Sequence, residues 1–161
     1  MQRFCIVIAA IMLILGISSS AAKTKTDWER DELRGKVKTL TVERVTFSEK
    51  FGQWEESARV QESVKTYDEQ GSAMKMTNYA DGVPSIWIIY SHDDSGRLSV
   101  ADFSDSTGNM VGKEAYAYDS RGDLTEVTHY DRDGSLDQKV VFTFDNSHNA
   151  TAYVVKGRLF V

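Results

Sequence analysis

The sequence is poor in the residues that staple or interrupt a fold. It has one cysteine and one proline among 161 residues, and the cysteine, Cys5, lies inside the apolar N-terminal run. If that run is removed on export, the remaining chain contains no thiol, which excludes disulfide bonds, cysteine-based zinc sites and thiolate catalysis. The fold must then be held together by apolar burial and backbone hydrogen bonding alone.

A long apolar run is also missing. Arg3 precedes an uncharged stretch of about 14 residues from Phe4 to about Ile17, and small residues follow up to Ala22. A membrane-spanning helix needs roughly 20 apolar residues, whereas this layout is typical of a secretory signal peptide. We therefore predict that residues 1–22 are a cleaved signal peptide, that no membrane span remains, and that the protein is exported to the periplasm, the cell surface or the medium.

Positive charge is scarce in the rest of the chain. Removal of residues 1–22 takes away only Arg3, so 18 of the 19 Lys and Arg remain against 24 Asp and Glu, and the formal charge becomes −6 instead of −5. An acidic surface disfavours nucleic acid and anionic lipid as partners.

The length of residues 23–161 suits one domain. In it we expect a helical segment at 23–35, a long first hairpin at 36–67 and hairpin repeats at 68–161.

Short hairpins with a recurring turn dominate the chain after the first hairpin. Glycines end these turns, and alternate turns recur at intervals of about 26 residues, which indicates a repeat of two strands and two turns. An aromatic residue, or once a histidine, opens each turn, and an aspartate usually follows it. The turn residues assigned on this pattern are Tyr67, Asp68, Gly71, Asp93, Gly96, Tyr118, Asp119, Gly122, Tyr130, Asp131 and Gly134.

Each residue type in this turn has a physical role. The aspartate side chain accepts hydrogen bonds from backbone N–H groups further along the turn. The glycine takes a left-handed conformation at little cost, as a type I turn followed by a G1 bulge requires. The aromatic ring covers its neighbour on the facing strand. At the last turn His148 stands in the glycine position, so His148 or Asn149 must take the positive φ angle.

Strand alternation predicts one aromatic face. The pairs on that face are Tyr90 with His92, Tyr116 with Tyr118, and Phe142 with Phe144. We therefore predict an all-β fold: an antiparallel meander of about nine to ten strands in tandem hairpins, forming a curled single sheet or a partly closed barrel, with a short N-terminal helix. Because an aromatic face must be covered, we expect the first hairpin and the segment around Trp28 to lie over it.

The turns resemble a known bacterial repeat. The stretch from Tyr118 to Leu124 (Tyr-Asp-Ser-Arg-Gly-Asp-Leu), and less closely that from His92 to Ser99, resemble the Tyr-Asp (YD) repeats of the RHS class. The resemblance covers roughly residues 64–155. It implies antiparallel strand–turn–strand units in a small, exported bacterial protein. Some proteins of this kind are labelled sugar-binding by analogy.

No catalytic constellation is visible in the sequence. The three histidines, His92, His129 and His148, lack the spacing of metal ligands, and no nucleophile-elbow or other triad motif occurs. We therefore predict a protein that is not an enzyme and that has no cofactor and no metal site. One alternative stays open, because acidic turns offer oxygen ligands to Ca²⁺ although no EF-hand pattern is present. The residues concerned are Asp93, Asp94, Asp131, Asp133 and Asp137.

Aromatic residues are the best argument for binding, since rings stack on sugars and contact peptides. Alternation assigns most of them to the core, but Trp87 falls on the face opposite Tyr90. We predict a binding module for glycan or protein at the cell envelope, with Trp54, Trp87, Tyr90 and His92 as candidate ligand-binding residues. The alternative is a structural or assembly protein whose sheet edge or aromatic face pairs with another chain. The oligomeric state stays open.

Overall fold

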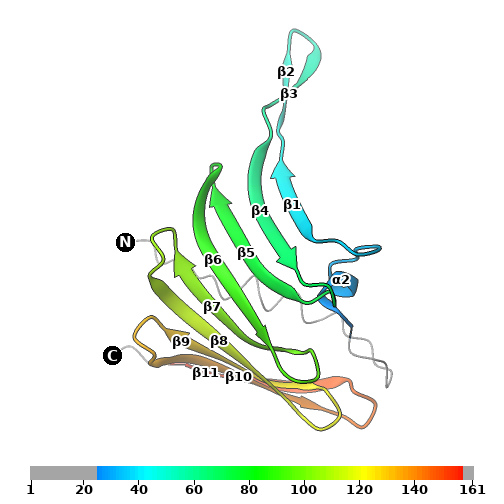
Figure 1. Ribbon diagram of the computed structural model, residues 1–161, viewed down its shortest axis with the longest axis vertical. Helices are drawn as coiled ribbons and strands as arrows, with labels where there is room; N and C mark the ends of the chain where they lie inside the picture. Colours follow the sequence, from blue (N-terminus) through cyan, green and yellow to red (C-terminus); the bar gives the residue numbers. More distant parts are fainter. Residues whose placement is uncertain (1–24, 158–161) are drawn as a thin grey trace.

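The computed structural model describes residues 25–157, and the predicted signal peptide lies outside them. The described chain forms a nine-stranded antiparallel sheet and a separate two-stranded ribbon, with one short helix before them (Figure 1). The predicted all-β meander and N-terminal helix are thereby confirmed. No helix in this part of the chain has the length and apolar character needed to span a membrane.

The main sheet follows the chain almost strand by strand. In spatial order its strands are β1 (Thr39–Arg44), β4 (Val60–Tyr67), β5 (Ala73–Ala80), β6 (Val83–His92), β7 (Leu98–Asp105), β8 (Met110–Tyr118), β9 (Leu124–Asp131), β10 (Leu136–Phe144) and β11 (Ala150–Gly157). The chain between β1 and β4 forms the ribbon of β2 (Phe47–Lys50) and β3 (Gln53–Glu56). The predicted first hairpin thus consists of an outer pair, β1 with β4, and an inner pair, β2 with β3.

The turns have the chemistry that their sequence predicts. In the turn after β8, Asp119 Oδ1 accepts hydrogen bonds from the backbone N–H groups of Arg121 and Asp123, at 2.9 and 3.0 Å. The N–H of Gly122 donates to the Asp119 carbonyl at 3.1 Å, and Gly122 has a φ of +89°. Four further turn aspartates accept the same two bonds, from the second and fourth residues after them: Asp68, Asp93, Asp105 and Asp145.

At the last turn the left-handed residue is His148, with a φ of +63°. Its Nδ1 lies 2.7 Å from Asp123 Oδ1 in the preceding turn of the same end of the sheet. The contact ties two neighbouring turns together and offsets part of the strain that a non-glycine residue carries there.

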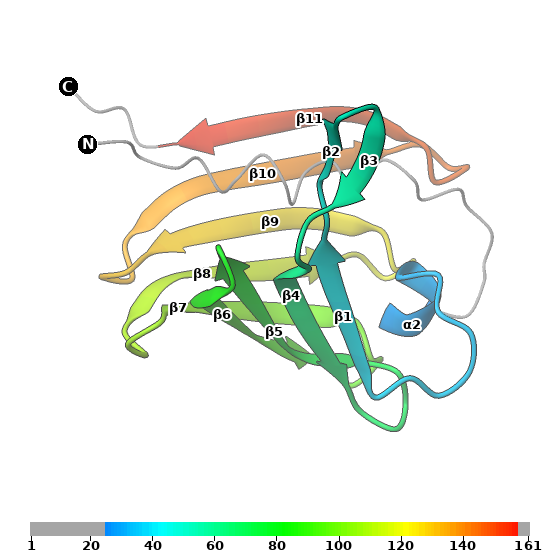
Figure 2. The same ribbon diagram turned by 90° about the horizontal axis from the view of Figure 1, so that it is seen from above.

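Bulges curl the sheet. A register shift interrupts every one of the eight strand pairings in the main sheet. Because a bulge bends its strand and increases the local twist, eight of them in series give the sheet a concave and a convex face (Figure 2). The sheet is an open curl and not a closed barrel, so β1 and β11 remain its outer strands.

The concave face is the aromatic one. Register places Tyr90 opposite Ala101, and Ala101 opposite Glu114, so these residues share a face that also carries Tyr116. Trp87 lies opposite Ser104 on the other, convex face. The apolar residues with less than a tenth of their surface exposed are Tyr67, Ala73, Ile88, Ala101, Leu124 and Val140.

Helix α2 (Asp27–Arg30) covers one end of the concave face (Figure 2). Thr26 caps it in a capping box with Glu29, and the helix ends at Arg30, before the end of the predicted helical segment at residue 35. Trp28 anchors the segment: its ring lies against Tyr67, with centroids 6.4 Å apart, and its indole N–H donates to the Val37 carbonyl at 2.6 Å.

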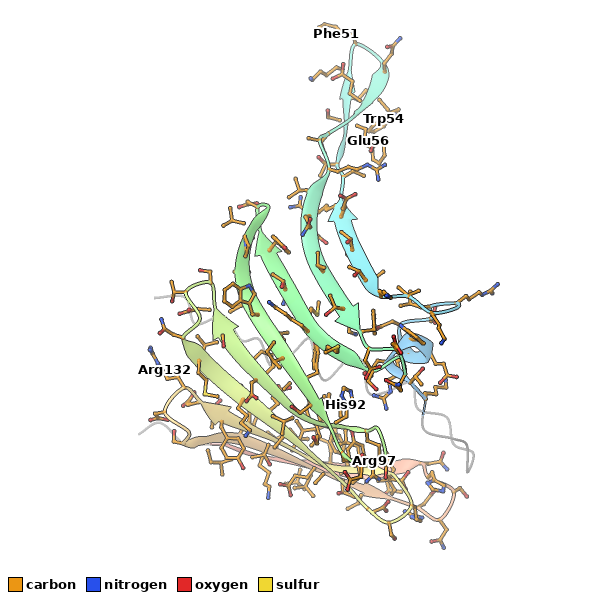
Figure 3. The ribbon with its side chains drawn as sticks, viewed as in Figure 1. Phe51, Trp54, Glu56, His92, Arg97 and Arg132 are labelled. Carbon is orange, nitrogen blue, oxygen red and sulfur yellow. The ribbon has the colours of Figure 1, made fainter. Side chains whose placement is uncertain are left out.

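The ribbon of β2 and β3 does not cover the concave face; it projects away from the sheet (Figure 1). The expectation that the first hairpin covers the aromatic face is therefore wrong. The physical reason is its mixed surface, since Phe47 pairs with Glu56 and Trp54 pairs with Glu49 on one side of the ribbon. Burying that side would desolvate two carboxylates. Phe51 at the tip and Trp54 stay exposed (Figure 3).

Two turn glycines allow a matched test of this packing. Gly71 and Gly122 both have a φ near +90°, but an added Cβ at Gly71 would lie 2.5 Å from Trp28, whereas at Gly122 it meets nothing within 4 Å. Gly122→Ala should lower the free energy of unfolding by about 1–2 kcal/mol through backbone strain alone. Gly71→Ala should cost about 1–3 kcal/mol more, because Trp28 must move. Denaturant unfolding and Trp fluorescence measure both; equal losses would show that Trp28 is not docked there.

Candidate functional site

A row of residues crosses the middle of the concave face. Tyr90 on β6, Ala101 on β7, Glu114 on β8 and His129 on β9 lie directly opposite one another. Ala101 is 2% exposed and places only a methyl group between Tyr90 and Glu114. We call Tyr90, Glu114, Tyr116 and His129 the Glu114 cluster.

Glu114 is the unusual member of this cluster. It is only 8% exposed, although glutamate is rarely buried unless it is paired. The Tyr116 hydroxyl donates to Glu114 Oε2 at 2.5 Å, while Oε1 lies 3.8 Å from His129 Nδ1, beyond hydrogen-bond distance. Within residues 25–157, Tyr116 therefore supplies the one hydrogen bond to this carboxylate. Its remaining lone pairs can accept a hydrogen bond from a ligand.

Two tyrosines of the cluster are held in their neutral form. Burial, together with the negative charges of Asp27, Asp31 and Glu114, raises the pKa of Tyr90 to about 12. Burial and the neighbouring Glu114 carboxylate also raise the pKa of Tyr116 far above its usual value. At neutral pH both residues therefore present O–H groups that can donate hydrogen bonds.

Acidic residues attach the N-terminal segment beside this cluster. Asp27 Oδ2 accepts a hydrogen bond from the backbone N–H of Ala73 at 2.7 Å and lies 3.0 Å from His92 Nε2. Asp31 accepts hydrogen bonds from the Lys65 ammonium, at 2.6 Å, and from the Tyr67 hydroxyl. His92 is thus engaged in holding α2 against the sheet.

The structure separates the ligand-binding residues predicted from the sequence. Tyr90 and His92 lie on the concave face, but Trp87 lies on the convex face under the Lys75 ammonium, 5.0 Å from the ring centroid. Trp54 stands on the projecting ribbon (Figure 3). Sequence reasoning missed Glu114, although its alternation with Tyr116 and Tyr118 was a signal that a carboxylate faces the aromatic side.

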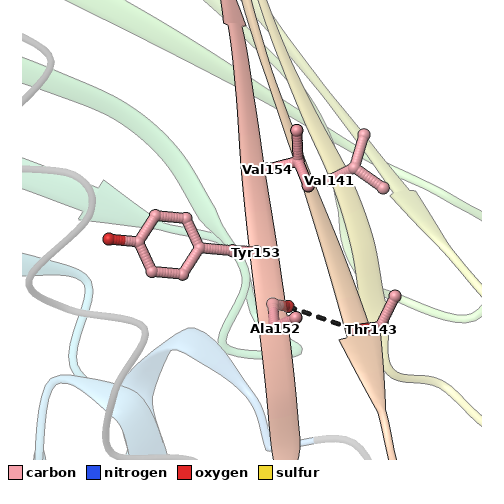
Figure 4. Close-up of a pocket in the computed structure, with 5 residues that line it drawn as sticks. All are labelled: Val141, Thr143, Ala152, Tyr153 and Val154. Atoms are coloured by element: carbon pink, nitrogen blue, oxygen red, sulfur yellow. Dashed lines mark hydrogen bonds between the residues drawn. The ribbon is translucent and has the colours of Figure 1, made fainter.

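A second surface lies at the outer edge formed by β10 and β11. A shallow depression there is lined by Val141, Thr143, Ala152, Tyr153 and Val154, and the Tyr153 ring points to the side opposite the side chains of Val141 and Thr143 (Figure 4). The Thr143 hydroxyl donates to the Ala152 carbonyl at 3.3 Å. This surface is mainly apolar and lies on a strand that has only one neighbour among the described residues.

A third group lies where β9 and β10 meet their common turn. A ring nitrogen of His129 and carboxylate oxygens of Asp131 and Asp137 all lie within 4.8 Å of one another. Of the acidic turn residues considered for calcium, the structure therefore joins Asp131 and Asp137. Asp133 instead accepts a hydrogen bond from the backbone N–H of Ser135 at 2.9 Å. The carboxylate of Asp93 bonds within its own turn and to Arg97, which lowers its pKa.

Comparison of the chain with protein-family models and with curated proteins finds no match. Among solved structures, part of the chain is similar to a chain described as "Crystal structure of GtfA/B complex bound to UDP and GlcNAc". The match has a TM-score of 0.26 and 17% identity, and it covers 60% of this chain and 22% of that chain. A likeness this low carries no argument about function.

The buried tyrosines predict a sensitivity to alkaline pH. Because the pKa values of Tyr90 and Tyr116 in the folded protein lie above the usual 10.0, their contribution to stability is complete below about pH 10 and is lost as the pH rises beyond it. The Tm should fall between about pH 10 and pH 12. Thermal unfolding followed by circular dichroism, with tyrosinate absorbance at 295 nm, measures both effects.

Tyr116→Phe should flatten this fall while lowering the free energy of unfolding at pH 8 by about 1–3 kcal/mol, because buried Glu114 loses its donor. Tyr153→Phe is the matched control, since Tyr153 is 70% exposed and should keep the wild-type pH dependence. The same fall in Tyr116→Phe as in the wild type would contradict the role of Tyr116.

Proposed function

We propose that this chain is an exported, non-enzymatic binding module whose concave face takes up a glycan at the cell envelope. The observation that carries the proposal is the nearly buried Glu114 carboxylate on an aromatic floor, with one hydrogen bond from the described chain. A peptide with hydroxyl or amide donors is the alternative ligand. The predicted signal peptide and the YD-like turns support the exported location.

The chemistry of the Glu114 cluster suits a sugar ring. A sugar offers hydroxyl donors on its edge and apolar C–H groups on its face, and the cluster offers a carboxylate acceptor and two tyrosines on the same face. The neutral hydroxyl of Tyr90 adds a donor for a sugar oxygen, whereas that of Tyr116 donates its proton to Glu114 and can only accept from a ligand. Ala101 lies between Tyr90 and Glu114 in the sheet, and its short side chain leaves the space above it open.

Binding fits this geometry better than hydrolysis does. Glycosidases generally use two facing carboxyl groups, one of them a proton donor. Asp27 and Asp31 of the N-terminal segment are engaged with His92, Lys65 and Tyr67. Asp131 lies opposite Gly112 and not opposite Glu114. We assign Glu114 the role of an acceptor that orients a ligand, and the proposed activity needs no cofactor.

Glycan arrays, followed by calorimetry on the strongest hit, test this proposal. Glu114→Gln should weaken binding about 10-fold or more, because a hydrogen bond to a charged acceptor contributes about 1.5–3 kcal/mol. Glu62→Gln is the control, since the Glu62 side chain is 46% exposed and pairs with Arg44 on the outer strand β1. Well-folded protein without a hit would count against a glycan ligand, and unchanged affinity in Glu114→Gln would remove the cluster from the site.

A second candidate function is assembly through strand β11, with a second copy of this chain as the partner. Tyr153, Val154 and Val155 are 70%, 52% and 46% exposed on this outer strand. The opposite edge is different, because Glu43 and Arg44 of β1 form ion pairs with Arg59 and Glu62. Charged residues protect an edge from pairing, and an apolar edge invites it. Antiparallel pairing of two β11 strands would join two sheets across a two-fold axis.

Sedimentation velocity over a range of concentrations tests the assembly. The wild type should form a dimer as the concentration rises, and Val154→Lys should shift the protein to monomer, because an edge lysine opposes strand pairing. Val83→Lys is the control, since Val83 is also more than half exposed but lies at the start of β6. A wild-type monomer at all concentrations would rule the assembly out.

A further inference from the structure

Three potential metal ligands from two adjacent strands converge beside the Glu114 cluster. His129 and Asp131 lie two residues apart on β9, so both side chains stand on the concave face. Asp137 comes from β10, at a bulge: Tyr130 pairs with Leu136 and His129 pairs with Gln138, so Asp137 has no partner on β9. One nitrogen and two carboxylate groups meet there with all three ligand atoms within 4.8 Å of one another.

The Asp131 carboxylate does not accept the backbone hydrogen bonds that five other turn aspartates accept. Five turn aspartates accept two backbone N–H groups each, as described above for Asp119. In the Asp131 turn, Asp133 takes the N–H of Ser135 instead. In the described part of the chain, the side chain of Asp131 makes no hydrogen bond within its turn and is directed to the cluster with His129 and Asp137.

The imidazole of His129 has an unused nitrogen and a cleared space. Its Nδ1 is buried, lies 3.8 Å from Glu114 Oε1 and has no hydrogen-bond partner among the described residues, so no hydrogen bond of this atom has to break when the ring binds a metal. Gly112, opposite Asp131 on β8, leaves room at the ring, because a Cβ there would lie 3.4 Å from His129 Cε1 and 3.2 Å from the Tyr130 carbonyl oxygen. Gly112 is not among the glycines with a positive φ, so its value lies in this space and not in backbone freedom.

The donor set selects the class of ion. Two carboxylates this close repel each other, and a divalent cation removes that repulsion. Imidazole favours Zn²⁺ and other late transition metals, whereas Ca²⁺ and Mg²⁺ prefer oxygen ligands alone. We propose that His129, Asp131 and Asp137 form a three-ligand site for Zn²⁺, with water completing the tetrahedral shell. The proposal does not depend on glycan binding, although His129 belongs to both groups.

Calorimetric titration of Zn²⁺ into the protein, freed of any affinity tag and treated with chelator, tests this site. We expect one Zn²⁺ per chain with a Kd in the low micromolar range or tighter, and Ca²⁺ binding at least about 100-fold weaker. His129→Ala and Asp137→Asn should each weaken Zn²⁺ binding by about 10-fold or more. Zn²⁺ should also raise the Tm of the wild type by mass action.

His148→Gly is the matched control. It removes a histidine that is already paired with Asp123 and restores the glycine of the repeat, so Zn²⁺ affinity should not change. Imidazole NMR shifts on adding Zn²⁺ should identify His129 as the coordinating histidine. If His129→Ala does not fold, Asp131→Asn, which keeps the side-chain shape, and Gly112→Ala, which crowds the ring, give the same test.

Three results would overturn the proposal. The first is a Kd above about 100 μM or a stoichiometry well below one, which corresponds to adventitious surface binding. The second is a response of His92 or His148 in place of His129. The third is Ca²⁺ binding equal to that of Zn²⁺ and unaffected by His129→Ala, which would return the acidic residues to the calcium alternative. Because Zn²⁺ alone is the probe, none of these outcomes depends on whether the concave face binds glycan.

Discussion

The aspartate–glycine turn governs the rest of this structure. Each turn closes a hairpin and also places an extra residue beside it, because seven of the eight register shifts in the main sheet adjoin a turn. Each bulge bends its strand and increases the local twist. A local hydrogen-bond pattern, repeated along the chain, thus produces a curled sheet with an inner face. The inner face in turn brings polar residues of neighbouring strands together above an apolar floor.

Turn chemistry and strand alternation carried the prediction of the fold, because both are local properties of the chain. The left-handed glycine of Gly122, the positive φ of His148 and the aromatic side of β8 follow from residues a few positions apart. The projecting ribbon does not follow from such local patterns. It forms because β1 pairs with β4, which leaves the residues between these two strands outside the main sheet. We expected the first hairpin to cover the aromatic face, but the glutamates paired with Phe47 and Trp54 keep its ribbon in solvent.

The candidate sites were less predictable, because each depends on contacts across strands. Glu114 is a site residue through its burial beside Tyr116 and His129, and alternation alone shows only the face on which it lies. Asp137 joins Asp131 through a bulge whose position no local pattern specifies. Of the aromatic candidates, Trp87 was placed on the correct face, but its contact with Lys75 comes from the neighbouring strand β5.

The strand order has a consequence for how the chain gains and loses its structure. From β5 to β11 each strand pairs only with its neighbours in the sequence. Contacts of such short sequence separation need little loop closure, so the sheet can form by adding one hairpin to the last. Opening then begins at the two ends and moves inward. Amide protons of β1 and β11 should exchange with solvent first, and those of β7 and β8, which support Glu114, should exchange last.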